Sequence, residues 1–136
     1  MGAGKRTNGA PGLVYLDTHT AVWLTQGETD WLSKKAQEAI ERGILRLSPM
    51  AVIELDMLYE IQRVAQPASK TVLALQVVLG VEVCEVAWIH VVEAARRVHW
   101  TRDPFDRLIV AHAALQGAQL ITRDEVILRN YERALC

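Results

Sequence analysis

Short apolar runs alternate with longer segments of helical periodicity along most of this chain. Four runs, at residues 13–16, 44–47, 81–86 and 119–122, have the length and composition of buried β-strands. Between them, apolar residues recur at spacings of three and four, which predicts amphipathic helices. Strands that alternate with helices in this way indicate an α/β domain built on a parallel sheet.

Capping signals set the ends of the predicted helices. Ser33 precedes a helix that Gly43 ends, and the Ser48-Pro49 pair begins another, because serine caps a helix and proline fits its first turn. Gly80 ends a third helix. The predicted helices cover residues 20–24, 33–42, 49–64, 68–79, 89–98 and 105–116, followed by a helical turn at 125–131 and an edge strand at 134–135.

One acidic residue lies within an apolar stripe. The helix that begins at Pro49 carries apolar residues at spacings of three and four, at positions 50, 53, 57, 61 and 64. Glu54 falls inside this stripe, whereas Asp56 and Glu60 project from the other side. We therefore expect the stripe and Glu54 to face the core, and Asp56 and Glu60 to face water.

Three aspartates occupy comparable positions. Asp17 and Asp124 follow predicted strands, and Asp106 enters a helix that is apolar nearly all round. The carboxyl ends of the strands in an open α/β sheet are where binding sites are built, and an unpaired carboxylate among apolar residues is costly. These three aspartates and Glu54 are therefore expected to share one pocket that binds divalent cations.

Each acid also has a structural interpretation of its own. Asp17, Asp103 and Asp124 stand where an N-cap is expected. Asp106 is placed to complete a capping box, and Glu54 could be paired with a buried arginine. These interpretations stay open for the individual residues, whereas a metal site explains the acids together.

Composition and charge limit the class of protein. The chain has 136 residues, 51% of them hydrophobic, and a net charge of −1, which suits one domain with its own core and excludes a globally basic nucleic-acid binder. No apolar run approaches the roughly 18 residues of a membrane span, and two cysteines give no disulfide framework. We expect a cytoplasmic protein, with residues 1–12 as a flexible tail and residues 13–136 as a single domain.

Several residues beside the acids suit a phosphate-containing substrate. Arg102, Arg107 and Arg123 flank the acids, and a guanidinium group can hold two phosphate oxygens at once. His19 is a further candidate for substrate contact. The tryptophans are expected in the core and at its rim, although an exposed pair near residues 23–31 would suit a partner-binding patch. The absence of HExxH and CxxC motifs argues against zinc.

Four short motifs carry the acids along the chain: LDTH at 16–19, VIEL at 52–55, RDPFDRL at 102–108 and LITRD at 120–124. In these motifs the sequence resembles the PIN-domain ribonucleases, and among them the VapC-like toxins of prokaryotic toxin–antitoxin pairs. The resemblance covers nearly everything from Leu13 to Leu135. It implies a PIN-like three-layer α/β/α sandwich with a central, mostly parallel sheet of four to five strands.

The resemblance also implies an endoribonuclease that hydrolyses RNA phosphodiester bonds with one or two Mg²⁺ or Mn²⁺ ions. The catalytic and metal-binding residues implied by motif are Asp17, Glu54, Asp106 and Asp124. Asp103 stays open as the alternative metal ligand in the third motif, and Thr18 and Thr122 resemble the hydroxyl neighbours of such acids. The implied partners are RNA, a cognate antitoxin and a second copy of the chain in a homodimer, without a membrane.

Two other classes of function stay open. A PIN-fold protein could act mainly as a non-catalytic protein-binding module, which would not bind Mn²⁺. A haloacid-dehalogenase-like phosphatase also begins with a strand that ends in an aspartate. Its chemistry needs a second acid two residues later, where this chain has His19. The acids directed inward favour the nuclease over both alternatives.

Overall fold

The computed structural model describes residues 12–136, which form five strands and seven helices. The strands are β1 (Leu13–Leu16), β2 (Ile44–Leu47), β3 (Glu82–Val83), β4 (Gln119–Ile121) and β5 (Ala134–Leu135). The helices are α1 (Thr18–Thr25), α2 (Lys34–Arg42), α3 (Pro49–Glu60), α4 (Ala68–Leu79), α5 (Trp88–Ala95), α6 (Pro104–Leu115) and α7 (Glu125–Asn130). The predicted tail lies outside the described residues except for Gly12, whose carbonyl accepts a hydrogen bond from Ile44 N–H.

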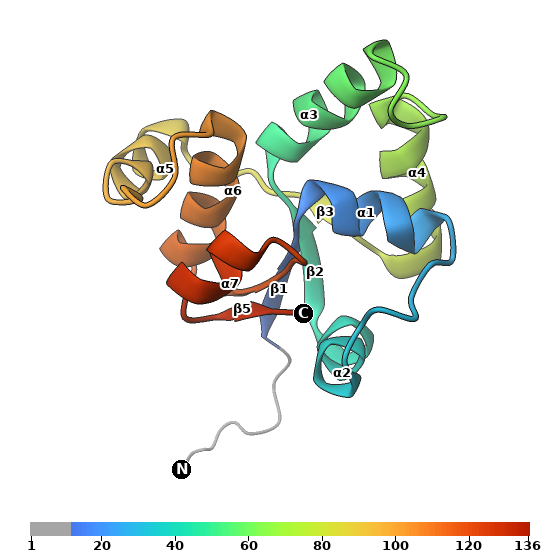
Figure 1. Cartoon of the computed structure of the whole chain (residues 1–136), viewed down its shortest axis with the longest axis horizontal. Helices are drawn as coiled ribbons and strands as arrows, with labels where there is room; N and C mark the ends of the chain where they lie inside the picture. Colours follow the sequence, from blue (N-terminus) through green and yellow to red (C-terminus); the bar gives the residue numbers. More distant parts are fainter. Residues whose placement is uncertain (1–11) are drawn as a thin grey trace.

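All five strands run parallel, in the order β3-β2-β1-β4-β5. The chain moves from β1 outward to β2 and β3 and then returns across β1 to β4 and β5. Helices α1, α2 and α4 lie on one side of the sheet, and α5 and α6 lie on the other (Figure 1). The predicted α/β sandwich with a parallel sheet is therefore confirmed.

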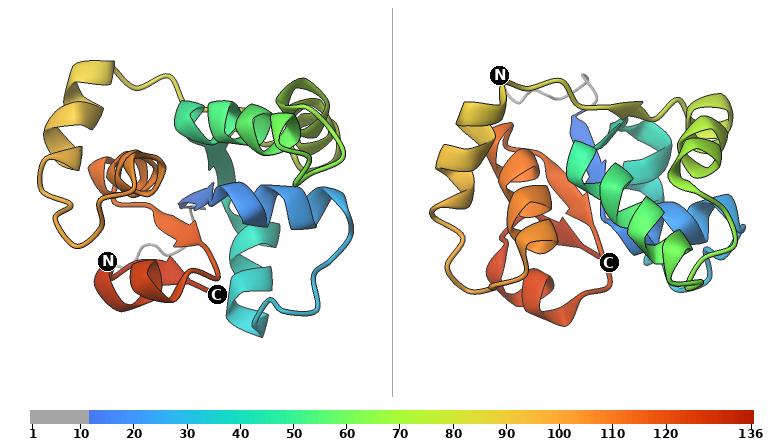
Figure 2. Two further views of the ribbon diagram at one scale, coloured as in Figure 1. Left: turned by 45° about the horizontal axis from the view of Figure 1, so that its top comes forward. Right: turned by 90° about the horizontal axis from the view of Figure 1, so that it is seen from above.

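The reversal of direction at β1 determines where a site can form. At such a switch point, the connections leave β1 and β4 on opposite sides, which opens a crevice at the carboxyl ends of these two strands. Helices α3 and α6 lie next to each other at this end of the sheet (Figure 2). The ends of β1 and β4 and the starts of α3 and α6 are therefore the elements from which a site can be built.

The central strands are buried on both faces, and therefore read as continuous apolar runs in the sequence. Tyr15 of β1 and Leu120 of β4 have no solvent exposure. Beside them, the buried His112 of α6 stacks on Tyr15, and its Nδ1 lies 2.9 Å from the Oγ of Ser48 at the start of α3. This contact joins the start of α3 to α6.

Several elements differ from their predicted extents. Helix α3 ends at Glu60 rather than at Val64, and α5 ends at Ala95 rather than at Val98. Helix α1 begins at Thr18 rather than at Thr20, because the Asp17 carboxylate caps it by accepting a hydrogen bond from Thr18 N–H. The strand predicted at 81–86 is reduced to the two residues of β3, which pairs only with β2 at the edge of the sheet. Within residues 12–136, no helix combines the length and the apolar character needed to cross a membrane.

The apolar stripe that was expected to face the core on α3 is largely exposed. Ile53 and Met57 are 53% and 45% exposed, whereas Ala51 and Leu55 are fully buried. The prediction was wrong for the stripe because α3 has apolar residues on two faces, and packing against other elements decides which face is covered. Glu54 lies between the two faces and is half-buried.

Candidate active site

Asp17 lies at the carboxyl end of β1 and is joined to the end of β4. Its backbone N–H donates to Ile121 O at 3.0 Å, and Thr122 Oγ1 donates to Asp17 Oδ2 at 2.7 Å. Thr18 N–H donates to Asp17 Oδ1 at 2.7 Å. Burial raises the pKa of Asp17, while the hydrogen bonds from Thr122 and Thr18 lower it. Both oxygens of this carboxylate are thus held in place.

Glu54 approaches Asp17 from α3. Thr18 Oγ1 donates to Glu54 Oε1 at 2.5 Å, so Thr18 binds Asp17 through its backbone N–H and Glu54 through its hydroxyl. Burial raises the pKa of Glu54; the Thr18 hydroxyl lowers it, and the negative charge of Asp17 raises it again. The other acids of α3, Asp56 and Glu60, are exposed as predicted. Glu54 is therefore the acid of α3 that lies beside β1.

The two acids of the third motif have different surroundings. Asp103 is exposed, and its Oδ1 caps α6 by accepting hydrogen bonds from Phe105 N–H at 2.8 Å and Asp106 N–H at 3.1 Å. Asp106 is half-buried in the first turn of α6. Its pKa is raised to about 7 by burial and by the negative charges of Asp103, Asp17, Asp124 and Glu54. Asp106 therefore lies within the field of all the other acids.

Asp124 follows β4 and caps α7. Its Oδ1 accepts hydrogen bonds from Val126 N–H at 2.8 Å and Ile127 N–H at 3.1 Å. The backbone N–H of Asp124 donates to Thr122 Oγ1 at 3.0 Å. The fully buried Thr122 hydroxyl thus connects Asp17 and Asp124.

Capping accounts for some of the acids but not for all of them. Asp17, Asp103 and Asp124 cap α1, α6 and α7, as the structural interpretation of each predicted. Asp106 does not complete a capping box, because Asp103 N–H donates to a threonine hydroxyl instead. Within residues 12–136, Glu54 has no arginine partner. Capping and ion pairing therefore leave the inward positions of Asp106 and Glu54 unexplained.

The donor atoms of these acids are those of a hard cation site. Every acid supplies only carboxylate oxygens, the ligands that Mg²⁺ and Mn²⁺ prefer. In residues 12–136, however, no three acidic, histidine or cysteine side chains are arranged to hold one metal ion as they stand. Binding of one ion by several of these acids would therefore require their side chains to move closer together. A divalent cation would favour this, because it offsets the repulsion between carboxylates that raises the pKa of Asp106.

The residues that were expected to contact substrate differ in their exposure and contacts. His19 and Arg123 are exposed, next in sequence to Thr18 and Asp124. Arg102 is exposed just before α6. Arg107 instead donates from Nη2 to Ala95 O at 3.0 Å, which ties α6 to α5. Arg107 therefore has a structural contact, whereas Arg123 and His19 stay at the surface beside the acids.

An aromatic group next to the acids was not predicted as part of the site. The rings of Trp23 and Trp31 pack edge to face with centroids 5.1 Å apart, and Arg123 Cζ lies 5.2 Å and 5.5 Å from their centroids. The His19 ring lies 5.7 Å from that of Trp23. The sequence feature that could have identified this group is the spacing of four residues between His19 and Trp23, which places both on one face of a helix.

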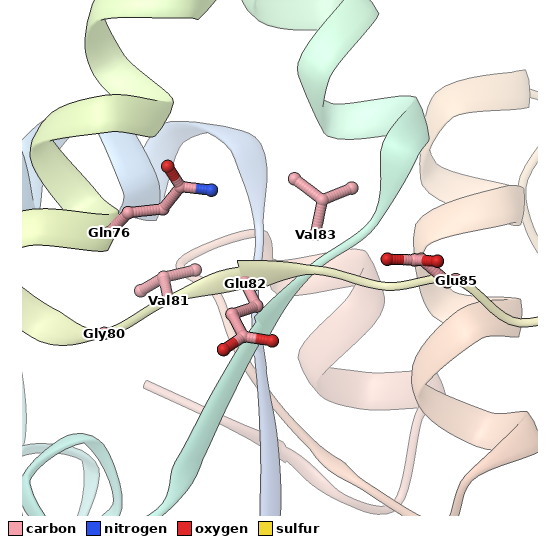
Figure 3. Close-up of a pocket in the computed structure, with 6 residues that line it drawn as sticks. All are labelled: Gln76, Gly80, Val81, Glu82, Val83 and Glu85. Atoms are coloured by element: carbon pink, nitrogen blue, oxygen red, sulfur yellow. The ribbon is translucent and has the colours of Figure 1, made fainter.

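A separate hollow of about 400 Å³ lies at the edge of the sheet (Figure 3). Glu82 and Val83 point to opposite sides of β3 there, as successive strand residues do. The lining residues are Gln76, Gly80, Val81, Glu82, Val83 and Glu85. Because none of the acids at the ends of β1 and β4 lines it, this hollow is not part of the candidate active site.

Comparison with protein families gives one match over most of the chain. The family model described as PIN domain matches residues 14–133. The chain belongs to the PIN domain family. This confirms the family that was expected from the four motifs of the sequence. No curated protein sequence matches this PIN domain.

Solved toxin–antitoxin structures contain chains with the fold of this PIN domain. A chain of VapBC2 from Rickettsia felis, bound to a DNA fragment from their promoter, has a TM-score of 0.61 at 17% identity over 91% of this chain and 97% of that one. A toxin–antitoxin complex from Klebsiella pneumoniae gives 0.62 at 18% identity over 90% and 96%. DNA-bound VapBC from Salmonella typhimurium gives 0.53 at 18% identity over 90% and 94%. At these identities the likeness establishes a shared fold.

Proposed function

We propose that this PIN domain is a divalent-metal-dependent endoribonuclease and the toxin of a toxin–antitoxin pair. The observation that carries the proposal is the linkage of Asp17 to Glu54 through Thr18 and to Asp124 through Thr122. Beside them, burial and the surrounding carboxylates raise the pKa of Asp106 to about 7. Acids crowded in this way suit a site in which Mg²⁺ or Mn²⁺ neutralises their charge. Their position at the switch point of the sheet supports the same conclusion.

The acids would share the binding of one or two ions. We assign the principal contacts to Asp17 and Asp106, with Asp124 and Glu54 completing the site. Asp106 is preferred to Asp103, because the Asp103 carboxylate already caps α6. When bound, the metal would lower the pKa of a water molecule and stabilise the charge that develops on the phosphate during hydrolysis.

The hydroxyl groups would keep these acids in position for the reaction. Thr122 holds Asp17 and the backbone of Asp124 at the ends of adjacent strands, and Thr18 holds Glu54 beside Asp17. Fixing the acids before substrate binds reduces the entropy that must be lost on reaching the transition state. The exposed Arg123 would contact the RNA backbone, for which a guanidinium group is suited.

We also propose that protein partners cover the exposed apolar surface of α3 and α4. Val77 and Val78 of α4 are each 75% exposed, and Ile53 and Met57 of α3 are also exposed. Exposed apolar side chains that gather on neighbouring helices are typical of protein interaction sites. The toxin–antitoxin complexes that share this fold support an antitoxin as one partner. A second copy of the chain, in a homodimer, is the other.

Metal-dependent cleavage of RNA by the purified full chain tests the enzymatic part of the proposal. Cleavage of a labelled single-stranded RNA is expected with Mg²⁺ or Mn²⁺ and should stop when EDTA is added. Glu54→Gln should lower the rate about 100-fold, the scale of losing one positioned carboxylate. Glu60→Gln provides a matched control, since Glu60 lies exposed on the same helix, and it should cleave at the wild-type rate.

Thermal unfolding distinguishes the nuclease from a non-catalytic binding module. Mn²⁺ should raise the Tm of the wild-type chain, because an ion that binds only the folded state stabilises it. The same concentration should leave the Tm of Asp17→Asn nearly unchanged. A wild-type chain that neither cleaves RNA nor gains stability from Mn²⁺ would contradict the proposed function.

A further inference from the structure

Four side chains form a surface cluster beside the acids, here termed the tryptophan–arginine cluster: His19, Trp23, Trp31 and Arg123. His19 and Trp23 lie on α1, Trp31 lies in the segment between α1 and α2, and Arg123 follows β4. The guanidinium carbon of Arg123 lies 5.2 Å from the Trp23 ring centroid and 5.5 Å from that of Trp31. One cation thus contacts two aromatic rings that come from a different part of the chain.

Two residues of the cluster are next in sequence to residues of the candidate active site. Arg123 stands between Thr122, whose hydroxyl binds Asp17, and Asp124. His19 follows Thr18, which binds both Asp17 and Glu54. His19 and Arg123 follow the ends of β1 and β4, as Asp17 and Asp124 do. A polymer chain bound over the acids would therefore place its next monomer at the cluster.

The guanidinium group of Arg123 has no polar partner in the described part of the chain. Within residues 12–136, no carboxylate lies within ion-pair distance of it, and its N–H groups donate no hydrogen bond to a side chain or carbonyl. This holds although Asp124 is the next residue. An arginine held against aromatic rings, with its donors unused, is prepared to bind an anion.

The two tryptophans differ in how they are held. Trp31 packs against the main hydrophobic core, and its Nε1–H donates to Glu28 O at 2.8 Å. Among the described residues that pack on this core, Trp23 is not included. Trp23 instead contacts His19, Trp31 and Arg123. Trp31 therefore anchors the cluster, whereas Trp23 is the ring that can change without loss of core packing.

We propose that the tryptophan–arginine cluster is a nucleotide subsite for single-stranded RNA, in which Arg123 binds the phosphate next to the scissile one and Trp23 stacks on its unpaired base. Such bases stack on aromatic side chains, and the guanidinium fork fits a phosphate. The inference rests on the proposed nuclease function and adds to it the residues that hold the nucleotide next to the cleaved bond. A duplex would present no free base face to Trp23.

The charge and the shape of the cluster favour RNA over a protein partner. The cationic group of the cluster is Arg123, next in sequence to Asp124, one of the acids that would repel a polyanion without a metal ion. An RNA strand supplies alternating phosphates and flat apolar bases, which match a cation placed beside aromatic rings. The most exposed large apolar side chains, Val77 and Val78, lie on α4 instead.

Binding of RNA to chains that cannot cleave it tests the subsite separately from the enzymatic activity. In an Asp17→Asn background with Mg²⁺, the Kd of a short labelled oligouridylate is measured by fluorescence anisotropy. Adding Trp23→Leu, which keeps an apolar cover over Trp31 but removes the aromatic face, should weaken binding about tenfold. Trp23→Phe should keep most of the affinity. Arg123→Gln should weaken binding and reduce its dependence on salt concentration.

Matched controls separate the subsite from general effects. Trp88 is 53% exposed on α5, on the other side of the sheet, and Trp88→Leu should leave RNA affinity unchanged. Arg129 is exposed on α7, so Arg129→Gln repeats the charge change of Arg123→Gln away from the cluster. Thermal unfolding of each variant shows whether it is folded. If Trp23→Leu does not fold, the RNA affinities of Arg123→Gln and its control Arg129→Gln are compared instead.

The outcomes for the two proposals differ. Normal RNA affinity in both Trp23→Leu and Arg123→Gln would overturn the proposed subsite. The cluster would then bind a different class of ligand, such as a protein. Equal loss in the Trp88→Leu control, or an equal contribution of Trp23 to binding of duplex RNA, would overturn it as well. Binding that depends on Trp23 in a chain whose wild type does not cleave RNA would contradict the nuclease and support the subsite.

Discussion

Thr122 donates a hydrogen bond of 2.7 Å to Asp17 across 105 positions of sequence, and this contact joins the end of β4 to the end of β1. The same Thr122 hydroxyl accepts from Asp124 N–H. A single buried hydroxyl group therefore sets the relative positions of two acids that the sequence places in separate motifs. The geometry of the candidate site depends on this threonine more than on any local turn.

Thr122→Val should destabilise the chain by about 1–3 kcal/mol, because the Asp17 carboxylate and Asp124 N–H would each lose a partner. Valine has nearly the same shape as threonine, so packing should change little. Urea unfolding measures the loss, and cleavage of RNA should fall as well. Thr122→Ser keeps the hydroxyl and should retain most of the stability and activity. A Thr122→Val chain as stable as the wild type would contradict the role of this contact.

Asp17→Asn should reduce RNA cleavage to the background rate while the chain stays folded. The asparagine carbonyl can still accept from Thr18 N–H, and its amide can donate to Thr122 Oγ1, so the hydrogen bonds need not be lost. Removing one buried negative charge should also leave the metal-free chain at least as stable as the wild type. Cleavage assays and urea unfolding in EDTA check both results. Wild-type cleavage by this variant would rule out Asp17 as a metal ligand.

Because its pKa is raised, Asp106 should destabilise the metal-free chain at high pH. With a folded-state pKa of about 7 and an ordinary value near 3.8, the folded chain holds a proton that the unfolded chain has released. The resulting stabilisation is fully present below about pH 4, decreases as pH rises between the two pKa values and is lost above about pH 7. The pKa values of Asp17 and Glu54 are also raised and act in the same direction.

Comparison with Asp106→Asn isolates this effect. Burial lowers the pKa of His112, so His112 favours the folded state less as pH falls through the ordinary histidine range. Both chains keep His112, and its contribution cancels in their difference. Unfolding free energies in EDTA should therefore favour the asparagine variant more at about pH 8 than at about pH 6. A difference that does not vary with pH would contradict the raised pKa of Asp106.

Gly43→Ala should destabilise the fold by about 1–3 kcal/mol through steric overlap. A Cβ atom at this position would lie 2.5 Å from Val14 Cγ2 and 2.6 Å from Ala39 O, and a backbone carbonyl of α2 cannot easily move. Gly12→Ala is the control, since a Cβ there meets nothing within 4 Å. Thermal unfolding of the two variants compares them. Equal Tm values would show that the junction of α2 and β2 tolerates a side chain.

Much of the order of strands and helices could be predicted because the signals are local. Ser33 and Ser48 cap α2 and α3, and Asp103 caps α6, as expected from their positions in the sequence. Gly80 ends α4 in the left-handed conformation. A cap needs one side-chain oxygen and a few neighbouring N–H groups, so these interactions are visible within a short window of sequence.

The acids of the candidate site were identifiable one by one, but their surroundings were not. The sequence favoured Asp106 over Asp103, which is placed to cap a helix, and the structure shows that cap together with the carboxylates that surround Asp106. The sequence left Trp23 among core and rim residues, although the structure places its ring against Arg123.

The sequence by itself determined the element order, the caps and the set of candidate acids, because these depend on residues close together in the chain. Tertiary structure decided which apolar face of α3 is covered, where Asp17 meets Thr122 and which ring Arg123 contacts. Such choices arise from many weak contacts between distant segments. Periodicity shows that a face is apolar, but only packing shows what lies against it.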